Sequence, residues 1–328
     1  MHVVVTGAAG FIGSHTAERL VAAGHQVTGI DAFDDYLYPA AVKRATAGEL
    51  AGLPGFRLVE ADICDRVAIA GVLDDRVDVV CHLAALAGVR PSLAEPLRYL
   101  RTNIEGTGVI IERMRAVGLR RLVFASSSSV YGVRPGADLR DVAAFSEDDP
   151  CLRPASPYAA TKRMNELQLS AYRDLFGLGV HALRFFTVYG PRQRPDMAIA
   201  KFTEAIAAGQ PLALFGDGSS RRDYTFIDDI VSGVVAAIGR VAPGDYELVN
   251  LGGTHTISLS ELVETIERVV GRTAVVDRQP HQPGDVPVTY ANIDRARALY
   301  GYQPTTRPDA GIARYWAWRQ GRGAVGPA

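Results

Sequence analysis

Tyr158 and Lys162 are the pair of residues in this sequence with the clearest capacity for chemistry, because they lie four positions apart just after Pro157. Proline is favoured in the first turn of a helix, and residues at positions i and i+4 share one helix face. A free tyrosine has a pKa of about 10 and is a weak base at neutral pH. A neighbouring ammonium group favours the phenolate, so the pair predicts a tyrosine that exchanges a proton with a hydroxyl group.

A run of hydroxyl side chains forms a second candidate cluster, where the sequence ASSSSVYG extends from Ala125 to Gly132. It follows the expected strand at residues 120–126, and ligands of open α/β sheets bind at the carboxyl ends of the strands. Four serines there favour a binding site over a core segment. The sequence has no G-x-S-x-G nucleophile elbow, so we do not expect an acyl-transfer nucleophile.

A glycine-rich segment near the N-terminus predicts a dinucleotide site. It follows a strand and opens a helix, and the residues expected to meet a pyrophosphate are Gly7, Gly10, Phe11, Ile12 and Gly13. Asp31 ends the second strand 18 residues after Gly13. A carboxylate there accepts hydrogen bonds from a ribose 2′-hydroxyl and repels a 2′-phosphate, so we expect NAD rather than NADP.

Further cofactor contacts are expected after the third and fourth strands and on the helix that follows. Polar and apolar side chains after the third strand suit adenine, and small residues after the fourth allow the backbone to approach the cofactor. These candidates are Asp62, Ile63, Leu83, Ala84, Ala85 and Asn103.

The elements that would position these residues alternate between apolar strands and amphipathic helices. The expected strands are His2–Thr6, Gln26–Asp31, Phe56–Glu60, Asp78–Leu83, Arg120–Ser126 and Val180–Phe185. The expected helices between them are Phe11–Ala23, Pro39–Leu50, Asp65–Leu73, Ala94–Val117 and Pro157–Phe176. This alternation predicts an α/β fold, a Rossmann-type doubly wound parallel sheet with helices on both faces.

The alternation becomes irregular after Phe185, which predicts a smaller, interleaved α/β C-terminal domain for the substrate. We expect a helix near Ala198–Ala208, a return to the sheet at Phe226–Ile238 and Glu247–Leu251, and a helix at Ser258–Val270 that begins with a capping box. The predicted domains are residues 1–186 with 226–251 for the cofactor, and 187–225 with 252–328 for the substrate.

Composition narrows the class of protein. The 328 residues are 48% hydrophobic and 22% charged with a net charge of −1, so we expect neither a nucleic-acid nor an anionic-membrane partner. Three cysteines without C-x-x-C spacing and scattered histidines support no disulfide framework and no metal site. Because the sequence shows no signal peptide and no long apolar run, we expect a cytoplasmic protein.

Over almost its whole length, from Val3 to about Trp318, the sequence resembles the extended short-chain dehydrogenase/reductases and, within them, the UDP-glucuronate 4-epimerases. The motifs that carry this resemblance are GAAGFIG, HLAALAGVR, ASSSSVYG, YAATK, RFFTVYGPRQRPDMA, RRDYTFIDDI and QPGDVPVTYA. The first and fourth motifs belong to the whole superfamily, whereas the fifth and the last are specific to the uronate branch. One departure is Gln282, where many sugar-nucleotide epimerases have arginine.

The resemblance implies a role for each matching residue. Tyr158 would be the base, Lys162 its electrostatic partner, and Ser127 the hydroxyl that hydrogen-bonds the reacting sugar oxygen. Phe185 would contact the nicotinamide of NAD, and Lys43 would contact its adenosine ribose. Contacts to the UDP moiety would come from Arg222, Asp285 and Phe215, and the glucuronate carboxylate would meet Ser128, Ser129, Thr187 and Arg194.

The expected reaction is reversible, NAD-dependent 4-epimerisation of UDP-glucuronate to UDP-galacturonate. Thr187 and Arg194 disfavour the first alternative, a UDP-glucose/UDP-galactose 4-epimerase, because galactose-type enzymes usually have asparagine at the Thr187 position. Ser129 disfavours the second, a decarboxylase or 4,6-dehydratase, because those enzymes typically carry an acid there. A catalytically silent NAD sensor is the non-enzyme alternative. The resemblance also implies a homodimer through Ala94–Val117 and Pro157–Phe176.

Overall fold

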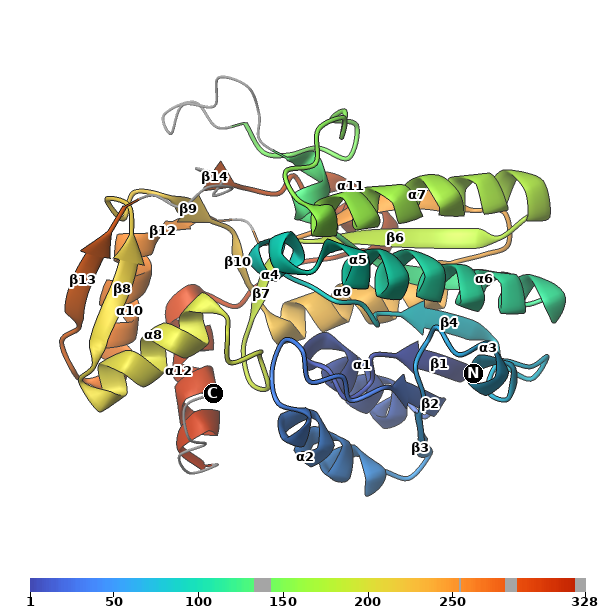
Figure 1. Cartoon of the computed structure of the whole chain (residues 1–328), viewed down its shortest axis with the longest axis horizontal. Coiled ribbons are helices and arrows are strands. Elements are labelled where there is room, and N and C mark those ends of the chain that lie inside the picture. The colour runs from blue at the N-terminus through green and yellow to red at the C-terminus, as the bar shows by residue number, and fades with distance from the viewer. Residues whose placement is uncertain (133–142, 254, 281–287, 322–328) are drawn as a thin grey trace.

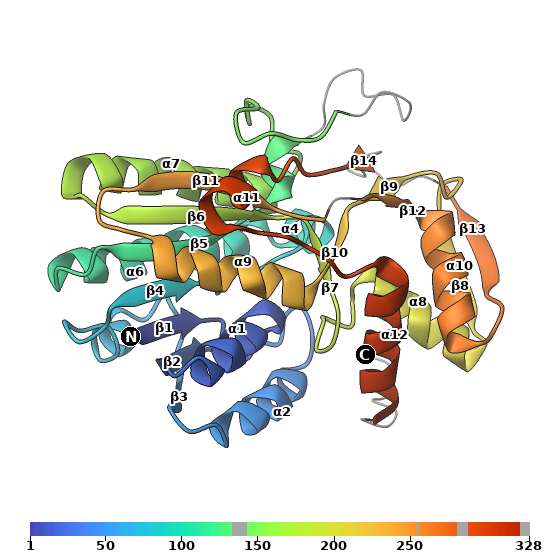
Figure 2. The ribbon, with the colours of Figure 1, turned by 180° about the vertical axis from the view of Figure 1, so that it is seen from behind.

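Seven parallel strands form the central sheet, in the order β11-β6-β5-β4-β1-β2-β3 (Figures 1 and 2, with all seven labelled in Figure 2). The computed structural model describes residues 1–132, 143–253, 255–280 and 288–321. The strands are β1 (His2–Thr6), β2 (Gln26–Asp31), β3 (Phe56–Glu60), β4 (Val79–His82), β5 (Arg121–Ser127), β6 (Gly179–Phe185) and β11 (Tyr246–Leu251). The strand order changes direction between β1 and β4, which is where doubly wound sheets bind their ligands. The predicted Rossmann-type fold is confirmed.

Helices cover both faces of the sheet, because both faces of each central strand are apolar. Val3 and Val5 are buried with Leu20 and Ile230, whereas Val4 is buried on the other face with Ile110. Figures 1 and 2 show the two layers from opposite sides. One layer contains α1 (Phe11–Ala22), α2 (Ala40–Ala51) and α9 (Ile227–Arg240), and the other contains α3 (Arg66–Ala70), α6 (Gly106–Ala116) and α7 (Pro157–Phe176).

Two sequence predictions on this part of the fold are wrong. Residues Phe226–Ile238 were expected in the sheet, but they form α9, since Ile227, Ile230, Val231 and Val234 recur at helical spacing and are buried. Residues Ala94–Val117 were expected as one helix. They instead form the end of α4 (Val89–Ala94), then α5 (Pro96–Tyr99), the π-helical segment η1 (Leu100–Glu105) and α6. Pro96 disfavours a helical conformation at the residue before it, so the helix is interrupted at Glu95.

The second half of the chain builds smaller elements beside the carboxyl end of the sheet. Ser258 caps α10 with the predicted capping box to Glu261. The chain then returns to the large sheet, where α11 (Asp294–Tyr300) contacts α9 and β11. The other elements there are β7 (Thr187–Tyr189), α8 (Ala198–Ala208), β8 (Pro211–Phe215), β9 (Arg221–Arg222), β10 (Tyr224–Phe226), β12 (Ile257–Ser258), α10 (Leu259–Val270), β13 (Val275–Gln279), β14 (Val288–Thr289) and α12 (Pro308–Gly321).

Within the described ranges, none of the helices combines the length and the apolar character needed to cross a membrane. The same ranges contain no cluster of three or more His, Cys, Asp or Glu side chains that would hold a metal ion.

Candidate active site

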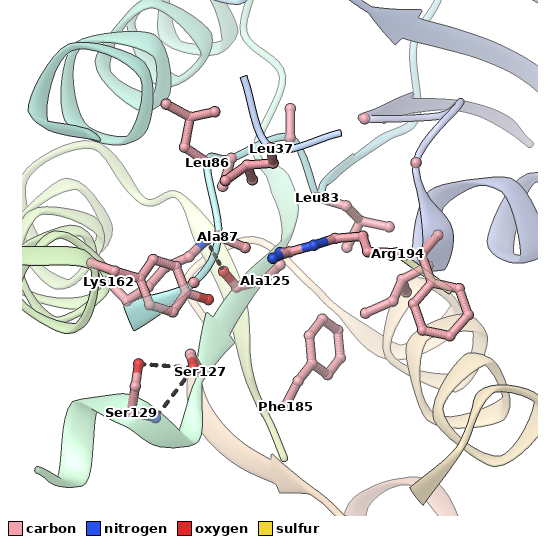
Figure 3. Close-up of a pocket in the computed structure, with 18 of the residues that line it drawn as sticks. Leu37, Leu83, Leu86, Ala87, Ala125, Ser127, Ser129, Lys162, Phe185 and Arg194 are labelled. Atoms are coloured by element: carbon pink, nitrogen blue, oxygen red, sulfur yellow. Dashed lines mark hydrogen bonds between the residues drawn. The ribbon is translucent and has the colours of Figure 1, made fainter. Parts of the chain in front are cut away.

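A cavity of about 680 Å³ lies at the carboxyl ends of the central strands, and most of the predicted site residues line it (Figure 3). It reaches from the glycine-rich turn after β1 to the segment between β7 and α8. The predicted residues in its lining are Gly7, Gly10, Phe11, Ile12, Gly13, Asp31, Lys43, Asp62, Ile63, Leu83, Ala84, Ala85, Ser127, Ser128, Ser129, Tyr158, Lys162, Phe185, Thr187, Arg194 and Arg222.

The turn between β1 and α1 is too tight for side chains at its glycines. Gly7 has a φ of 71°, and a Cβ on Gly13 would come within 2.0 Å of the Gly7 carbonyl oxygen. Gly10 is the N-cap of α1, and no side chain caps this helix end. The amide groups and the positive end of the helix dipole are therefore available to an anion, and this geometry fits the pyrophosphate of a dinucleotide.

Asp31 is held in a defined orientation at the end of β2. Its two carboxylate oxygens accept hydrogen bonds from the backbone amides of Ala9 (3.0 Å) and Phe33 (2.9 Å). Burial raises its pKa, although these amides and the Lys43 ammonium group oppose the shift. Asp31 lines the cavity at the position expected to bind an adenosine ribose.

Asn103 is the exception among the predicted cofactor residues, because it lies outside the cavity lining. Its side chain exchanges hydrogen bonds with the backbone of Leu86 (2.8 and 3.0 Å) and donates to the Thr161 hydroxyl (3.0 Å). Thr161 belongs to α7, so Asn103 supports the loop after β4 against the helix that carries Tyr158 and Lys162.

Tyr158 and Ser127 both line the cavity and share a side-chain hydrogen bond. Ser156 caps α7 by accepting a hydrogen bond from the Ala159 amide (3.1 Å), which fixes the helix start at Pro157. The Ser127 hydroxyl oxygen accepts hydrogen bonds from the Ser129 amide (3.2 Å) and the Ser129 hydroxyl (2.9 Å), as Figure 3 shows.

The electrostatic surroundings of Tyr158 include a charge that the sequence did not indicate. Burial raises the pKa of its phenol, whereas a hydrogen bond with Ser127 and the positive charge of Arg194 lower it. Arg194 therefore lies close enough to favour the phenolate, in addition to the ammonium group expected from Lys162.

Lys162 is buried beneath the site. Its ammonium group donates a hydrogen bond to the Ala125 carbonyl oxygen at 2.7 Å, and only 3% of the residue is exposed. Burial lowers the pKa of Lys162 to about 7, and the negative charge of Glu166 opposes this shift. The backbone contact holds the lysine one helical turn below Tyr158.

Arg194 extends into the cavity from the segment before α8 (Figure 3). Its Nε and Nη2 donate to the two carboxylate oxygens of Asp196 at 2.9 and 2.6 Å. Asp196 also lines the cavity and was missed by the sequence interpretation, although it stands two residues after Arg194 in the same motif.

Two predicted substrate residues are not part of the described lining. Phe215 lies at the end of β8, and the guanidinium group of Arg90, which does line the cavity, is 5.2 Å from the centre of its ring. Asp285 lies outside the residues that the structure describes.

Comparison with known proteins supplies an independent assignment. Residues 3–252 match the model of the NAD dependent epimerase/dehydratase family. A probable UDP-glucuronate 4-epimerase from Rhizobium meliloti is 38% identical over 336 residues, which cover 97% of this chain and 96% of the relative.

Solved structures show the same relationship. A UDP-glucuronic acid 4-epimerase from Bacillus cereus, in complex with UDP-glucuronic acid and NAD, has a TM-score of 0.89 and 36% identity, covering 98% of this chain and 99% of its own. A UDP-glucose 4-epimerase from Thermotoga maritima, with UDP-glucose, has a TM-score of 0.87 and 29% identity, covering 98% of this chain and 99% of its own. Because the family model matches residues 3–252 and the Rhizobium meliloti relative is 38% identical over 97% of the chain, the chain belongs to the NAD dependent epimerase/dehydratase family.

Proposed function

We propose that this protein catalyses the reversible 4-epimerisation of UDP-glucuronate to UDP-galacturonate with NAD as a retained cofactor. The observation that carries the proposal is a single cavity in which a glycine turn, Ser127, Tyr158 and Arg194 lie together. The similarity to the uronate epimerases named above supports the choice of substrate.

The cofactor would lie along the first half of the cavity. The glycine turn would hold its pyrophosphate, Asp31 its adenosine ribose, and Phe185 would contact the nicotinamide end. NAD, when bound, supplies the acceptor for a hydride and later its donor.

The residues of the chain would handle the proton and the orientation of the sugar. Ser127 would donate a hydrogen bond to the oxygen on carbon 4, and Tyr158 as phenolate would take the proton of that hydroxyl while carbon 4 loses its hydride. After the 4-keto sugar has rotated so that its opposite face lies toward the nicotinamide, the hydride would return to carbon 4. Tyr158 would then return the proton to the oxygen on carbon 4. Lys162 and Arg194 would favour the phenolate between the two half-reactions.

Hydride return must compete with loss of carbon dioxide. The 4-keto intermediate is a β-keto acid, and it decarboxylates when its carboxyl bond stands perpendicular to the plane of the carbonyl group. We propose that Thr187, Ser128 and the Arg194 fork hold the carboxylate away from that geometry. Ser129 supports hydride return as well, because its hydroxyl donates to Ser127 and provides no acid for elimination.

The proposal is tested by incubating the purified protein with UDP-glucuronate and, separately, with UDP-glucose, and separating the products. UDP-galacturonate as the main product of the first incubation is the expected result. Conversion of UDP-glucose alone would overturn the uronate assignment, and a UDP-pentose as main product would make the protein a decarboxylase.

We also propose a homodimer, because apolar side chains are exposed on the adjoining surfaces of α5, η1 and α7. Leu97 is 77% exposed and Leu167 is 58% exposed, and Met164 and Leu100 lie on the same elements. Light scattering should give twice the chain mass for the wild type and the chain mass for Leu97→Glu with Leu167→Glu. A monomeric wild type would contradict the proposal.

The division into two domains is retained as a proposal. The cofactor part would comprise residues 1–186 and 226–251, and the substrate part residues 187–225 and 252–328. Pairing of β8 with β13 and of β9 with β12 and β14 outside the central sheet supports it.

A further inference from the structure

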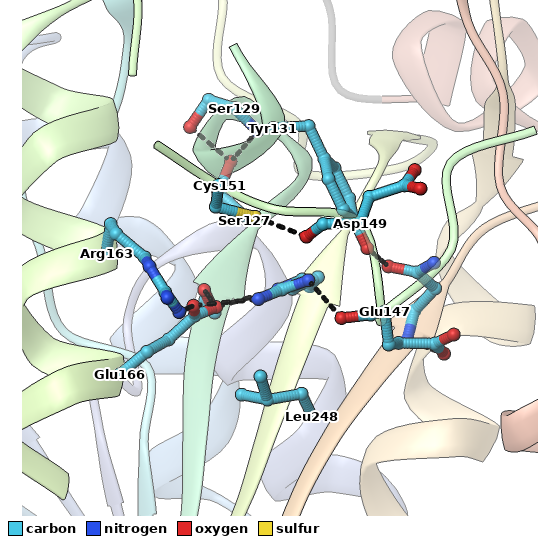
Figure 4. Close-up of polar contacts among 12 residues, drawn as sticks. Ser127, Ser129, Tyr131, Glu147, Asp149, Cys151, Arg163, Glu166 and Leu248 are labelled. Atoms are coloured by element: carbon cyan, nitrogen blue, oxygen red, sulfur yellow. Dashed lines mark hydrogen bonds and ion pairs between the residues drawn. The ribbon is translucent and has the colours of Figure 1, made fainter. Parts of the chain in front are cut away.

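A buried cluster of charged side chains lies behind the end of β5, between that strand and α7 (Figure 4). Glu166 and Arg184 are 0% and 1% exposed. Arg184 donates from Nε to Oε1 of Glu166 (2.8 Å) and from Nη2 to Oε2 (2.9 Å). The Ser126 hydroxyl donates to Oε1 at 2.6 Å, and Arg163 donates to Oε2 at 2.9 Å. Four hydrogen bonds therefore fix the position of one carboxylate.

This carboxylate joins β5 and α7, which carry Ser127 and Tyr158, to the neighbouring strand β6. Ser126 directly precedes Ser127, and its partner across the β5–β6 ladder is Arg184. Glu166 lies one helical turn beyond Lys162 and two turns beyond Tyr158 on α7. The backbone ladder holds β5 to β6, and the bond from Lys162 to the Ala125 carbonyl joins α7 to β5. The Glu166 carboxylate adds a second tie from α7 to β5, through Ser126, and a tie from α7 to β6, through Arg184.

Stability alone does not account for such a cluster. A buried ion pair pays a large desolvation cost, and well-packed apolar side chains of similar volume usually give the same stability or more. The four hydrogen bonds to the Glu166 carboxylate do, however, limit how far α7 can move relative to the ends of β5 and β6.

We propose that Glu166 is a positioning residue that keeps the Ser127 hydroxyl in register with Tyr158 by joining α7 to the strand ends of β5 and β6. The inference rests on the proposed function, because it assigns Ser127 and Tyr158 to the same reaction. A displacement of about 1 Å at a reacting group costs on the order of 100-fold in rate.

The charge of Glu166 has a second consequence, for Lys162. Glu166 raises the pKa of that buried lysine, whereas the desolvation of its site lowers it, and the ammonium group lowers the pKa of His82 on β4. Tyr158 in turn faces Arg194 and the ring of Tyr99. Loss of the carboxylate charge would leave Lys162 neutral over more of the pH range, and the phenolate of Tyr158 would lose a supporting cation.

Ser126→Ala tests the positioning role, since it removes one hydroxyl and leaves the Glu166–Arg184 pair intact. We expect kcat to fall 10- to 100-fold, with KM within about twofold of wild type and unchanged bound NAD. Loss of one buried hydrogen bond should lower Tm but leave the protein folded at the assay temperature. Thr203→Val is the matched control, because it removes a buried hydroxyl that bonds only within α8, outside the cavity lining. A kcat of Ser126→Ala within twofold of the control, or a loss that follows Tm, overturns the proposal.

Glu166→Gln tests the electrostatic consequence and is used only if Tm and NAD content show a folded protein. Its pH profile of kcat should have the acidic limb moved to higher pH, whereas Ser126→Ala should keep the wild-type limb because it retains the charge. An unmoved limb in a folded Glu166→Gln variant refutes the charge effect. Both variants are assayed with whichever UDP-sugar the wild type converts, so an inactive wild type would refute the proposed function instead.

Discussion

We propose that the choice between a uronate and a neutral sugar depends on Arg194. Its side chain is 17% exposed and lines the cavity, and its guanidinium group already forms a two-pronged pair with the carboxylate of Asp196. Asp196 pairs with the Nε–Nη2 edge, and the other two-donor edge of the guanidinium group, Nη1 with Nη2, suits the carboxylate of glucuronate. UDP-glucose has only a hydroxymethyl group at that position.

Arg194→Ala should therefore reduce turnover of the uronate selectively. A hydrogen bond to a charged group contributes about 1.5–3 kcal/mol, which corresponds to roughly a 10- to 100-fold loss in kcat/KM for UDP-glucuronate. A smaller loss is expected on both sugars, because Arg194 also lowers the pKa of Tyr158. The freed carboxylate should rotate toward the decarboxylating geometry, so a trace of UDP-4-keto-pentose is expected by mass spectrometry.

Arg194→Lys separates the two effects. It keeps a positive charge near Tyr158 but lacks the fork, so activity on UDP-glucose should recover while the selective loss on UDP-glucuronate persists. The assay is kcat/KM on both sugars for wild type and both variants. Equal losses on both sugars in Arg194→Ala would show that the arginine serves the shared chemistry or the fold, and the carboxylate contact would be refuted.

The remaining predictions concern the base, the cofactor and acid stability. Tyr158→Phe should lower kcat by about 10²–10⁴-fold while the bound NAD content stays unchanged, and near-normal turnover would show that another group is the base. Protein purified without added cofactor should release NAD on denaturation, because the cycle returns the hydride that it removes; dependence of activity on added NAD would contradict retention. Burial lowers the pKa of His82 to about 3, so the unfolded chain binds its proton first as the pH falls. The free energy of unfolding should then drop by up to about 1.4 kcal/mol per pH unit below about pH 6.5, and a His82→Gln variant that keeps the full slope in urea titrations would refute this assignment.

The central strands could be predicted to within one or two residues because both faces of each are buried. Val3, Val4 and Val5 all lie in the core, so the strand is a continuous apolar run bounded by polar or glycine residues. The helix α9 was mistaken for sheet because its apolar residues are β-branched. Their spacing of three and four positions was the signal that distinguishes a helix.

The residues proposed as catalytic could be predicted from the sequence because motif and local geometry agree. Tyr158 and Lys162 share a helix face, and Ser127 ends a strand, so local elements alone bring them to the same edge of the sheet. Glu166 gave no such signal, since its partners Ser126 and Arg184 are distant in sequence and meet only through the β5–β6 ladder. The position of Asn103 illustrates the same limit. The sequence predicts that Asn103 lies near the cofactor, but it does not show on which side of the loop its amide group lies.

The most direct test of the whole account is incubation of the purified protein, without added NAD, with UDP-glucuronate that carries deuterium at carbon 4. If Tyr158 moves only the hydroxyl proton and the hydride stays within the site, as proposed, the product should be UDP-galacturonate with the deuterium still on carbon 4. Loss of the label to solvent, a UDP-pentose as main product, or no conversion would contradict hydride return to a glucuronate held in this cavity.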